Sequence, residues 1–267
     1  MSETSLLPWR RPRVNVIVLH GIIAARAGML NADSARPLIE KAFAAAGRSP
    51  VILDIESPGG SPVQSDLIAS MIRAHADHAG VRVHAVIREV GASGGYWIAC
   101  AADEIHANAM SIVGSIGVVG GGFGFPDLLG RLGIERRIYT AGTNKARLDP
   151  FSPEKPEDVA FAKGLMDTLH VRFKDWVRSR RGRRLKAPDD QLFDGGYMLG
   201  EQALTAGLID GLTTVDELVR ELGGDRARAR ARRFAPKRPR LALRLPRMAI
   251  EAVLDVLEDR VWRVTLR

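Results

Sequence analysis

The sequence predicts an α/β fold. Short runs rich in valine and isoleucine alternate along the chain with longer stretches of helical periodicity, and this alternation is typical of α/β domains. The chain has 267 residues, 46% of them hydrophobic, which suffices for one large core or for a core with an appendage. We therefore expect one main domain, built of strands and helices in alternation.

The first half of that domain is predicted to hold four strands and two helices. The strands share a high content of β-branched residues or a short apolar alternation, and they are predicted at 14–20 (VNVIVLH), 51–56 (VILDIE), 82–90 (RVHAVIREV) and 104–110 (EIHANAM). A helix is predicted at 61–78, where Leu67, Ile68, Met71 and Ile72 have the spacing of one face. A second helix follows a turn at Ser93 and includes 96–103 (YWIACAAD).

The second half begins with a glycine-dense loop at 114–124 (GSIGVVGGGFG). A strand is predicted at 136–140 (RRIYT). Helices are predicted at 127–133, at 153–181 with Pro153 and Pro156 suited to its start, at 200–210 and at 213–222. No internal repeat is visible, so we expect this half to complete the same domain.

The excess positive charge lies in one segment near the C-terminus. The chain carries a net charge of +8, whereas residues 225–247 alone carry +9, so the remaining residues sum to −1. Beyond this segment, an apolar stripe at helical spacing is formed by Ile250, Val253, Leu254, Leu257, Val261 and Val264. The chain thus divides into an N-terminal arm (1–13), the main domain (14–223), a basic linker (224–247) and a C-terminal amphipathic helix (248–267).

The basic linker predicts contact with an anionic surface. Its one aromatic residue is Phe234, whereas proteins that bind single-stranded nucleic acid use several stacking aromatics. Contact with an anionic membrane through 225–247 is therefore expected, and nucleic acid is not. The apolar run at 14–25 is shorter than the ~20 residues needed to span a bilayer, and 1–13 has no signal-peptide pattern. We expect a cytoplasmic protein with peripheral contact at the inner face of the membrane.

The single cysteine, Cys100, excludes an intrachain disulfide and a zinc site made of cysteines. A reducing compartment fits this composition. We interpret Cys100 as a small core residue on the helix after Ser93. No cofactor and no metal is expected.

The most informative stretch is REVGASGGYW at 88–97, which matches the pattern G-x-S-x-G. A strand is predicted before Ser93 and a helix after it, as in a nucleophile elbow, and glycine lets backbone amides approach a substrate carbonyl. The pattern is short, so an ordinary small residue in a tight turn remains the alternative. Deciding between them requires a base, because a serine hydroxyl is a poor nucleophile until its proton is removed.

Histidine and lysine are the two candidate bases. Only His106 and His170 follow Ser93; the first lies 13 positions on and the second lies inside a long helix, so both are interpreted as structural. Lys145, in YTAGTNKARLDPF directly after the strand predicted at 136–140, is the other candidate. An amine serves as a base near neutrality only when burial lowers its pKa from about 10.4. Without further information Lys145 would be read as a solvated surface residue.

Four stretches together resemble the signal peptide peptidase (SppA, protease IV) family of serine peptidases. They are DIESPGGSPVQS (54–65), GASGGYWIACAADEIHANAMSIVGSIGV (91–118), AGTNKARLDPF (141–151) and LFDGGYMLGEQALTAGLIDGL (192–212), in the family's order. The resemblance implies a ClpP/crotonase-like fold, a spiral of β-β-α units. It makes 14–223 a single peptidase domain, with the basic tail and amphipathic helix appended.

The resemblance also implies a Ser–Lys dyad. Ser93 would be the nucleophile, Lys145 the general base and then the general acid, and Ser115 the residue that orients the lysine. The amides of Gly59, Gly60 and Gly94 would form the oxyanion hole, which agrees with the unobstructed N–H and the freedom of φ that glycine offers. The expected activity is that of a serine endopeptidase acting on short or unfolded peptides, assembled as a homo-oligomer.

Two other functions stay open at this point. An α/β-hydrolase-type esterase would use His170 as its base. A non-catalytic scaffold would use the basic arm to bind anionic lipid or RNA. The chain also departs from the family pattern, because many members begin with a membrane anchor and the fourth stretch has Gly196–Tyr197–Met198 where arginine–tryptophan is common. These departures bear on membrane association and on signal-peptide substrates.

Overall fold

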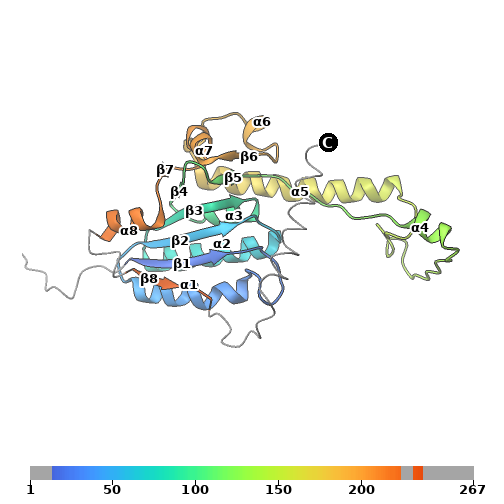
Figure 1. Ribbon diagram of the computed structural model, residues 1–267, viewed down its shortest axis with the longest axis horizontal. Helices are drawn as coiled ribbons and strands as arrows, with labels where there is room; N and C mark the ends of the chain where they lie inside the picture. The colour runs from blue at the N-terminus through green and yellow to red at the C-terminus, as the bar shows by residue number, and fades with distance from the viewer. Residues whose placement is uncertain (1–13, 224–230, 237–267) are drawn as a thin grey trace, which may run out of the picture. The chain divides into compact units, whose positions relative to one another are not determined.

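The computed structural model describes residues 14–223 and 231–236. Its centre is an eight-stranded sheet with the order β6-β5-β3-β2-β1-β8, in which β4 pairs with β3 and with β7 (Figure 1). The strands are β1 (Asn15–His20), β2 (Val51–Ser57), β3 (Val83–Ala92), β4 (Glu104–Ala107), β5 (Ile112–Gly114), β6 (Tyr197–Leu199), β7 (Gly211–Leu212) and β8 (Arg232–Phe234). All the pairings are parallel except that of β5 with β6.

Helices connect and cover these strands. They are α1 (Ala32–Ala46), α2 (Pro62–Ala79), α3 (Gly94–Ala99), α4 (Pro126–Arg131), α5 (Pro156–Arg181), α6 (Asp189–Leu192), α7 (Gly200–Ala206) and α8 (Val215–Gly223), with a short 3₁₀ helix at Gly182–Arg184. The order β1-α1-β2-α2-β3-α3 requires crossover helices, because neighbouring parallel strands cannot be joined by a tight turn.

The core lies on both faces of the central strands, because alternate residues of a strand point to opposite faces. One face carries Ile17, Leu53 and Ala85, which are fully buried in the larger apolar cluster together with residues of α1, α2 and α3. The other face carries Val16 and Ile52, which pack in a smaller cluster with Val86 and three residues of α8. Strands buried on both faces are typical of parallel sheets.

Most of the elements predicted from the sequence are confirmed. The predicted strands at 14–20, 51–56, 82–90 and 104–110 are present with boundaries shifted by a few residues. So are the predicted helices, at 61–78, 96–103, 127–133, 153–181, 200–210 and 213–222. The helix α1 was not predicted, although an N-terminal cap at Asn31 and buried Ile39 and Phe43 mark it. Within the basic linker, β8 extends the sheet beside β1. The predicted C-terminal helix at 248–267 and the N-terminal arm at 1–13 lie outside the described residues.

The predicted strand at 136–140 is wrong. This segment pairs with no strand of the described chain, and the Tyr139 side chain is 90% exposed. Arg136 is instead engaged by the Asp149 carboxylate through two hydrogen bonds of 2.9 Å. A strand forms where the backbone finds a partner edge, and local β-propensity does not supply one.

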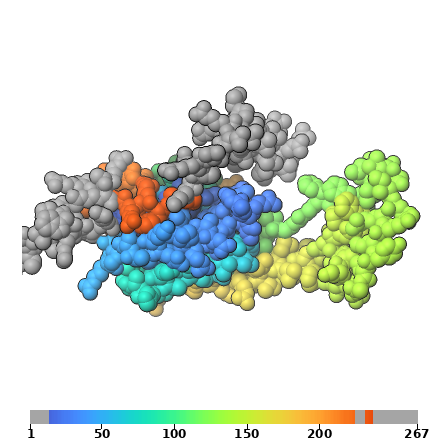
Figure 2. Space-filling view, turned by 90° about the horizontal axis from the view of Figure 1, so that it is seen from below, coloured from blue at the N-terminus to red at the C-terminus, as the bar shows by residue number. Residues whose placement is uncertain are grey.

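Residues 118–155, which include α4, form a projection carried by the N-terminal half of α5. Figure 1 shows it to one side of the sheet, and in Figure 2 it extends, in green, away from the blue N-terminal part of the described chain. The C-terminal half of α5 is docked, since Phe173 and Val177 are buried and the Trp176 indole donates to the main-chain oxygen of Trp97 at 3.0 Å. The N-terminal half is more open, and the Leu165 side chain there is 53% exposed. Thus one helix joins the sheet to the projection.

Candidate active site

Ser93 lies on a strained turn between β3 and α3. Its φ is 50° and its ψ is −120°, a conformation that is rare for residues other than glycine and that is often found at functional sites. The turn is held because the Ser93 amide donates to the Gly114 main-chain oxygen at 2.8 Å, and the Ser93 oxygen accepts from the Trp97 amide at 2.9 Å. The Ser93 side chain is half-buried. A serine at such a strand-to-helix turn can present its hydroxyl as a nucleophile.

The end of β2 lies directly against this turn. A Cβ built on Gly59 would lie 2.8 Å from the Ser93 Cβ and 2.7 Å from the Gly94 nitrogen, and one built on Gly95 would lie 2.4 Å from the Ser57 carbonyl oxygen. Both positions therefore require glycine. The pairing of Ser57 with Gly91 across β2 and β3 sets this close approach.

The three amides predicted for the oxyanion hole differ in their present partners. The Gly94 amide is the first of α3, and first-turn amides of a helix have no partner within it. The Gly59 amide donates to the Ser57 hydroxyl at 3.2 Å. Gly60 has a φ of +138° and lies beside Ile23, as an isolated β-bridge. Of the three, the Gly94 amide directly follows Ser93 and is placed to stabilise a negative oxygen there.

Backbone hydrogen bonds place Ser115 close to the Ser93 turn. Gly114, its neighbour, accepts the Ser93 amide, while the Ser115 amide donates to the Gly196 oxygen at 2.7 Å. Ser115 has a φ of 51° and is half-buried. The structure thus brings Ser93, Ser115 and Gly196 close together. Gly196 belongs to 192–212, the last of the four stretches that resemble the peptidase family.

Lys145 is not part of this group within one chain. It lies in the projection, its side chain is exposed, and its amide donates to the Gly142 oxygen at 3.2 Å. Across the described ranges 14–223 and 231–236, its ammonium group has no hydrogen-bond or ion-pair partner. The base predicted by the resemblance is therefore on the surface, in the projection that Figure 1 shows to one side of the sheet.

The two histidines after Ser93 have other partners. His170 Nε2 lies 3.0 Å from the Ile116 main-chain oxygen; because a carbonyl only accepts, this nitrogen carries the proton. His170 thus supports the segment that follows Ser115. His106 lies on β4, beside Glu104 and His84. Among the described residues, neither histidine forms a hydrogen bond with Ser93, so the structure does not support a Ser–His triad of the α/β-hydrolase kind.

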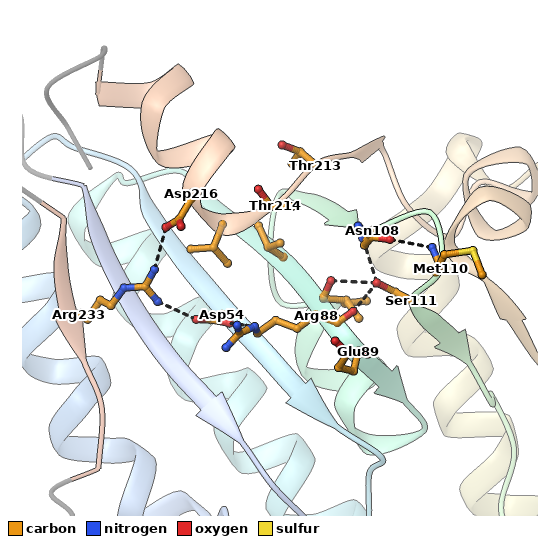
Figure 3. Close-up of a pocket in the computed structure, with 13 residues that line it drawn as sticks. Asp54, Arg88, Glu89, Asn108, Met110, Ser111, Thr213, Thr214, Asp216 and Arg233 are labelled. Atoms are coloured by element: carbon orange, nitrogen blue, oxygen red, sulfur yellow. Dashed lines mark hydrogen bonds and ion pairs between the residues drawn. The ribbon is translucent and has the colours of Figure 1, made fainter. Parts of the chain in front are cut away.

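A pocket of about 380 Å³ lies elsewhere on the sheet (Figure 3). It is lined by charged groups around Asp54, whose carboxylate is buried between Arg233 at 3.1 Å and His20 at 3.1 Å. Ser93 is not among the lining residues. Sequence reasoning did not single out this cluster; the aspartate inside the apolar strand VILDIE was its one signal. Because its buried charge is already paired, the pocket is not the candidate catalytic centre.

Comparison with known proteins assigns the family. Residues 75–227 match peptidase family S49. The chain is 33% identical over 178 residues to the probable protease SohB of Buchnera aphidicola subsp. Schlechtendalia chinensis, covering 66% of this chain and 57% of that protein. It is 29% identical over 208 residues to the putative protease slr0021 of Synechocystis, covering 78% and 72%. The chain belongs to peptidase family S49, whose ClpP/crotonase-like fold confirms the predicted fold class.

Another similarity concerns a longer protein. The chain is 43% identical over 248 residues to the Na(+)/H(+) antiporter NhaA of Brucella abortus, covering 90% of this chain and 33% of that protein. The chain thus spans a third of the length of this relative, and transport is a property named for that protein. In the part of the chain that the structure describes, no helix is both long enough and apolar enough to cross a membrane.

Proposed function

We propose that this chain is a serine endopeptidase of the SppA/SohB kind in which Ser93 is the nucleophile. The observation that carries the proposal is the strained Ser93 backbone, with a φ of 50°, directly beside the Gly94 amide and the end of β2. Acyl transfer requires a hydroxyl that can attack the substrate carbonyl and, beside it, backbone amides that can bind the oxyanion. Membership of a peptidase family also supports a role in peptide hydrolysis.

The proposed reaction proceeds in two halves. The Ser93 Oγ attacks the peptide carbonyl while a neutral lysine amine takes its proton, and the Gly94 amide, with that of Gly60, binds the resulting oxyanion. The lysine then gives this proton to the leaving amine as the C–N bond breaks. A water molecule attacks the acyl-enzyme while the same lysine amine takes its proton. The lysine amine then gives this proton to Ser93 Oγ as the ester C–O bond breaks, and the carboxylic acid product leaves.

Lys145 is the proposed base, supplied by a second copy of the chain. In one chain its amine is exposed on the projection, whereas a lysine base must be buried to be neutral near pH 7. The projection exposes large apolar side chains, among them Val119, Phe123, Leu128, Leu132, Ile134 and Tyr139. Apolar patches of this kind mark protein–protein contacts. A homo-oligomer would cover them and place Lys145 beside the Ser93 and Ser115 of a neighbour.

The proposed substrates are short or unfolded peptides. A folded protein does not present an extended backbone to a half-buried serine at the end of a sheet. Relatives named as SppA and SohB proteases support a peptide substrate.

Variant activities test the proposal. We would measure cleavage of a denatured protein and of a fluorogenic peptide panel between about pH 7 and 9 by the wild type and by Ser93→Ala, Lys145→Ala and His170→Ala. Loss of a nucleophile or of its base is expected to lower kcat by about 10³-fold or more. His170→Ala removes one hydrogen bond and is expected to lower activity by less than about tenfold.

Lys155→Ala is the matched control, because Lys155 is another exposed lysine of the projection. It is expected to keep wild-type activity. A Ser93→Ala protein as active as the wild type would overturn the proposal. The remaining hypothesis would then be that the protein is a non-catalytic scaffold.

A further inference from the structure

Three side chains capable of binding a metal meet on one face of the sheet, at the end remote from Ser93. His84 lies near the start of β3, and Glu104 and His106 lie on β4. The parallel register places His84 opposite Glu104 and Val86 opposite His106. Because residues two apart on a strand share a face, all three side chains point the same way. The two imidazole rings are stacked, with centroids 6.0 Å apart.

The donor atoms converge on a common point. Glu104 Oε2 lies 3.4 Å from His84 Nδ1 and 3.6 Å from His106 Nε2, and the three atoms all lie within 4.8 Å of one another. A tetrahedral Zn²⁺ with bonds of about 2.0–2.1 Å separates its ligand atoms by about 3.3–3.4 Å. The two nitrogen–oxygen separations are therefore close to those of a zinc site. The two nitrogens, within 4.8 Å of one another, would have to approach by at most about 1.4 Å to complete it.

Within residues 14–223 and 231–236, both nitrogens lack any partner other than Glu104. His84 Nδ1 and His106 Nε2 are buried and make no hydrogen bond, and the His84 side chain is 7% exposed. Buried polar atoms without a partner are costly and rare in folded proteins. Burial lowers the pKa of His84, with His106 and Arg82 acting in the same direction and Glu104 opposing them. This favours neutral imidazole, the form that binds metals.

Neighbouring residues orient Glu104 and leave space for the His106 ring. Arg82 donates to the other carboxylate oxygen, Oε1 of Glu104, at 2.7 Å, which leaves Oε2 directed to the histidines. Contacts of this kind orient metal ligands in known sites. A Cβ built on Gly211 of β7 would lie 2.9 Å from His106 Nδ1, so the glycine leaves room for the ring.

We propose that His84, Glu104 and His106 bind a Zn²⁺ ion, with a fourth position open to water. Two imidazoles and one carboxylate suit zinc better than calcium or magnesium, which prefer oxygen ligands. His84 and Ser93 are nine positions apart in sequence, which is up to about 30 Å along β3, so the proposed role of the ion is to join strands. It ties β3 to β4, which in turn pairs with β7 through His106 and Gly211.

The test is metal binding by the full chain, made without a polyhistidine tag and stripped with a chelator. Calorimetric titration with ZnCl₂ at pH 7.5 is expected to show one equivalent bound, and Co²⁺ is expected to give the visible absorption of a tetrahedral site. Because the ion binds the folded state, zinc at a hundredfold excess over its Kd is expected to raise Tm by about 5–10 °C.

Substitutions localise the site. Glu104→Gln, His84→Ala and His106→Ala are each expected to weaken zinc binding at least about tenfold. The control His78→Ala removes an exposed histidine at the end of α2 and is expected to bind zinc as the wild type does. Wild-type protein that binds no zinc, or binding unchanged in Glu104→Gln, would overturn the proposal. The first of these results is measured on the wild-type protein, so it does not depend on whether a variant folds.

Discussion

At the residue scale, the Ser93 turn depends on close backbone contacts that only glycine allows. The chain passes from β3 to α3 through a serine with positive φ, and the following helix begins with two glycines. The second, Gly95, faces the Ser57 carbonyl oxygen, where a Cβ would lie only 2.4 Å away. The main chain of β2 cannot yield as a flexible side chain would, so this contact fixes how closely α3 can approach β2.

Gly95→Ala tests this packing. The added methyl group is expected to lower the free energy of unfolding by about 1–3 kcal/mol, as overpacking does elsewhere, and to reduce peptidase activity by displacing Ser93. Urea unfolding and peptide cleavage would measure both effects.

Gly164→Ala is the matched control. A Cβ there meets nothing within 4 Å, and Gly164 lies inside α5, so alanine is expected to raise stability by about 0.5–1 kcal/mol. Equal effects of the two substitutions would contradict the account of the turn.

Those parts of the candidate site that lie close together in the sequence could be predicted from it. Ser93 and Gly94 are adjacent in sequence, and a strand, a glycine-rich turn and a helix follow one another, so the pattern identified the turn. Lys145 was predicted as the base only by resemblance and stays a prediction. Under the proposed function its role depends on the projection and on a second copy of the chain, which no local spacing encodes. Each of the strands β3 and β4 carries one histidine, in RVHA and EIHA, but whether the two rings meet depends on the strand register, which sets His84 opposite Glu104.

At the scale of elements, α3 is enclosed by segments from the second half of the chain. The Tyr96 hydroxyl donates to the Leu208 main-chain oxygen at 2.7 Å, and Arg180 of α5 donates to the Cys100 oxygen at 2.8 Å. Tyr96 and Cys100 are fully buried, as expected for Cys100. Burial raises the pKa of the Cys100 thiol from 9.0 to about 12.

This burial predicts sensitivity to alkaline pH. The thiol keeps its proton in the folded state and loses it above pH 9.0 in the unfolded state, so its contribution to stability is complete below pH 9.0 and is lost as pH rises toward 12. Between pH 8 and 10 the wild type is expected to lose about 1 kcal/mol more than Cys100→Ala, measured by urea unfolding at each pH.

Val177→Ala provides the control for this prediction. It removes a buried but non-titrating group of α5, so it is expected to be less stable at every pH while keeping the pH dependence of the wild type. Identical pH dependence in wild type and Cys100→Ala would show that the thiol does not ionise differentially.

The elements were predicted best where apolar periodicity and tertiary contacts agree. Strands β1, β2 and β3 are buried on both faces, and their valine- and isoleucine-rich runs marked them. The segment at 136–140 contains the β-formers Ile138, Tyr139 and Thr140, but it has no neighbouring strand edge among the described residues, so it stays unpaired there. Strand β8 shows the reverse: Arg232–Phe234 has a basic sequence, yet the free edge of β1 recruits it.

At the scale of the whole molecule, the described chain holds Ser93 and Lys145 apart. Ser93 belongs to the sheet, while Lys145 lies on a projection with exposed apolar side chains. Closed symmetric assemblies are the usual state of homo-oligomers, and in such an assembly each projection can serve the neighbouring sheet. The proposed dyad then exists only between copies, and an isolated chain is expected to be inactive.

Complementation between two inactive variants tests this claim most directly. Ser93→Ala and Lys145→Ala chains would be co-expressed with different tags, purified as a mixed assembly and assayed on a fluorogenic peptide. With random mixing, about a quarter of the sites in a symmetric assembly combine an intact Ser93 with an intact Lys145 of the neighbour. The account predicts activity near that fraction of wild type, with each variant alone inactive. A mixed assembly no more active than the separate variants would contradict it.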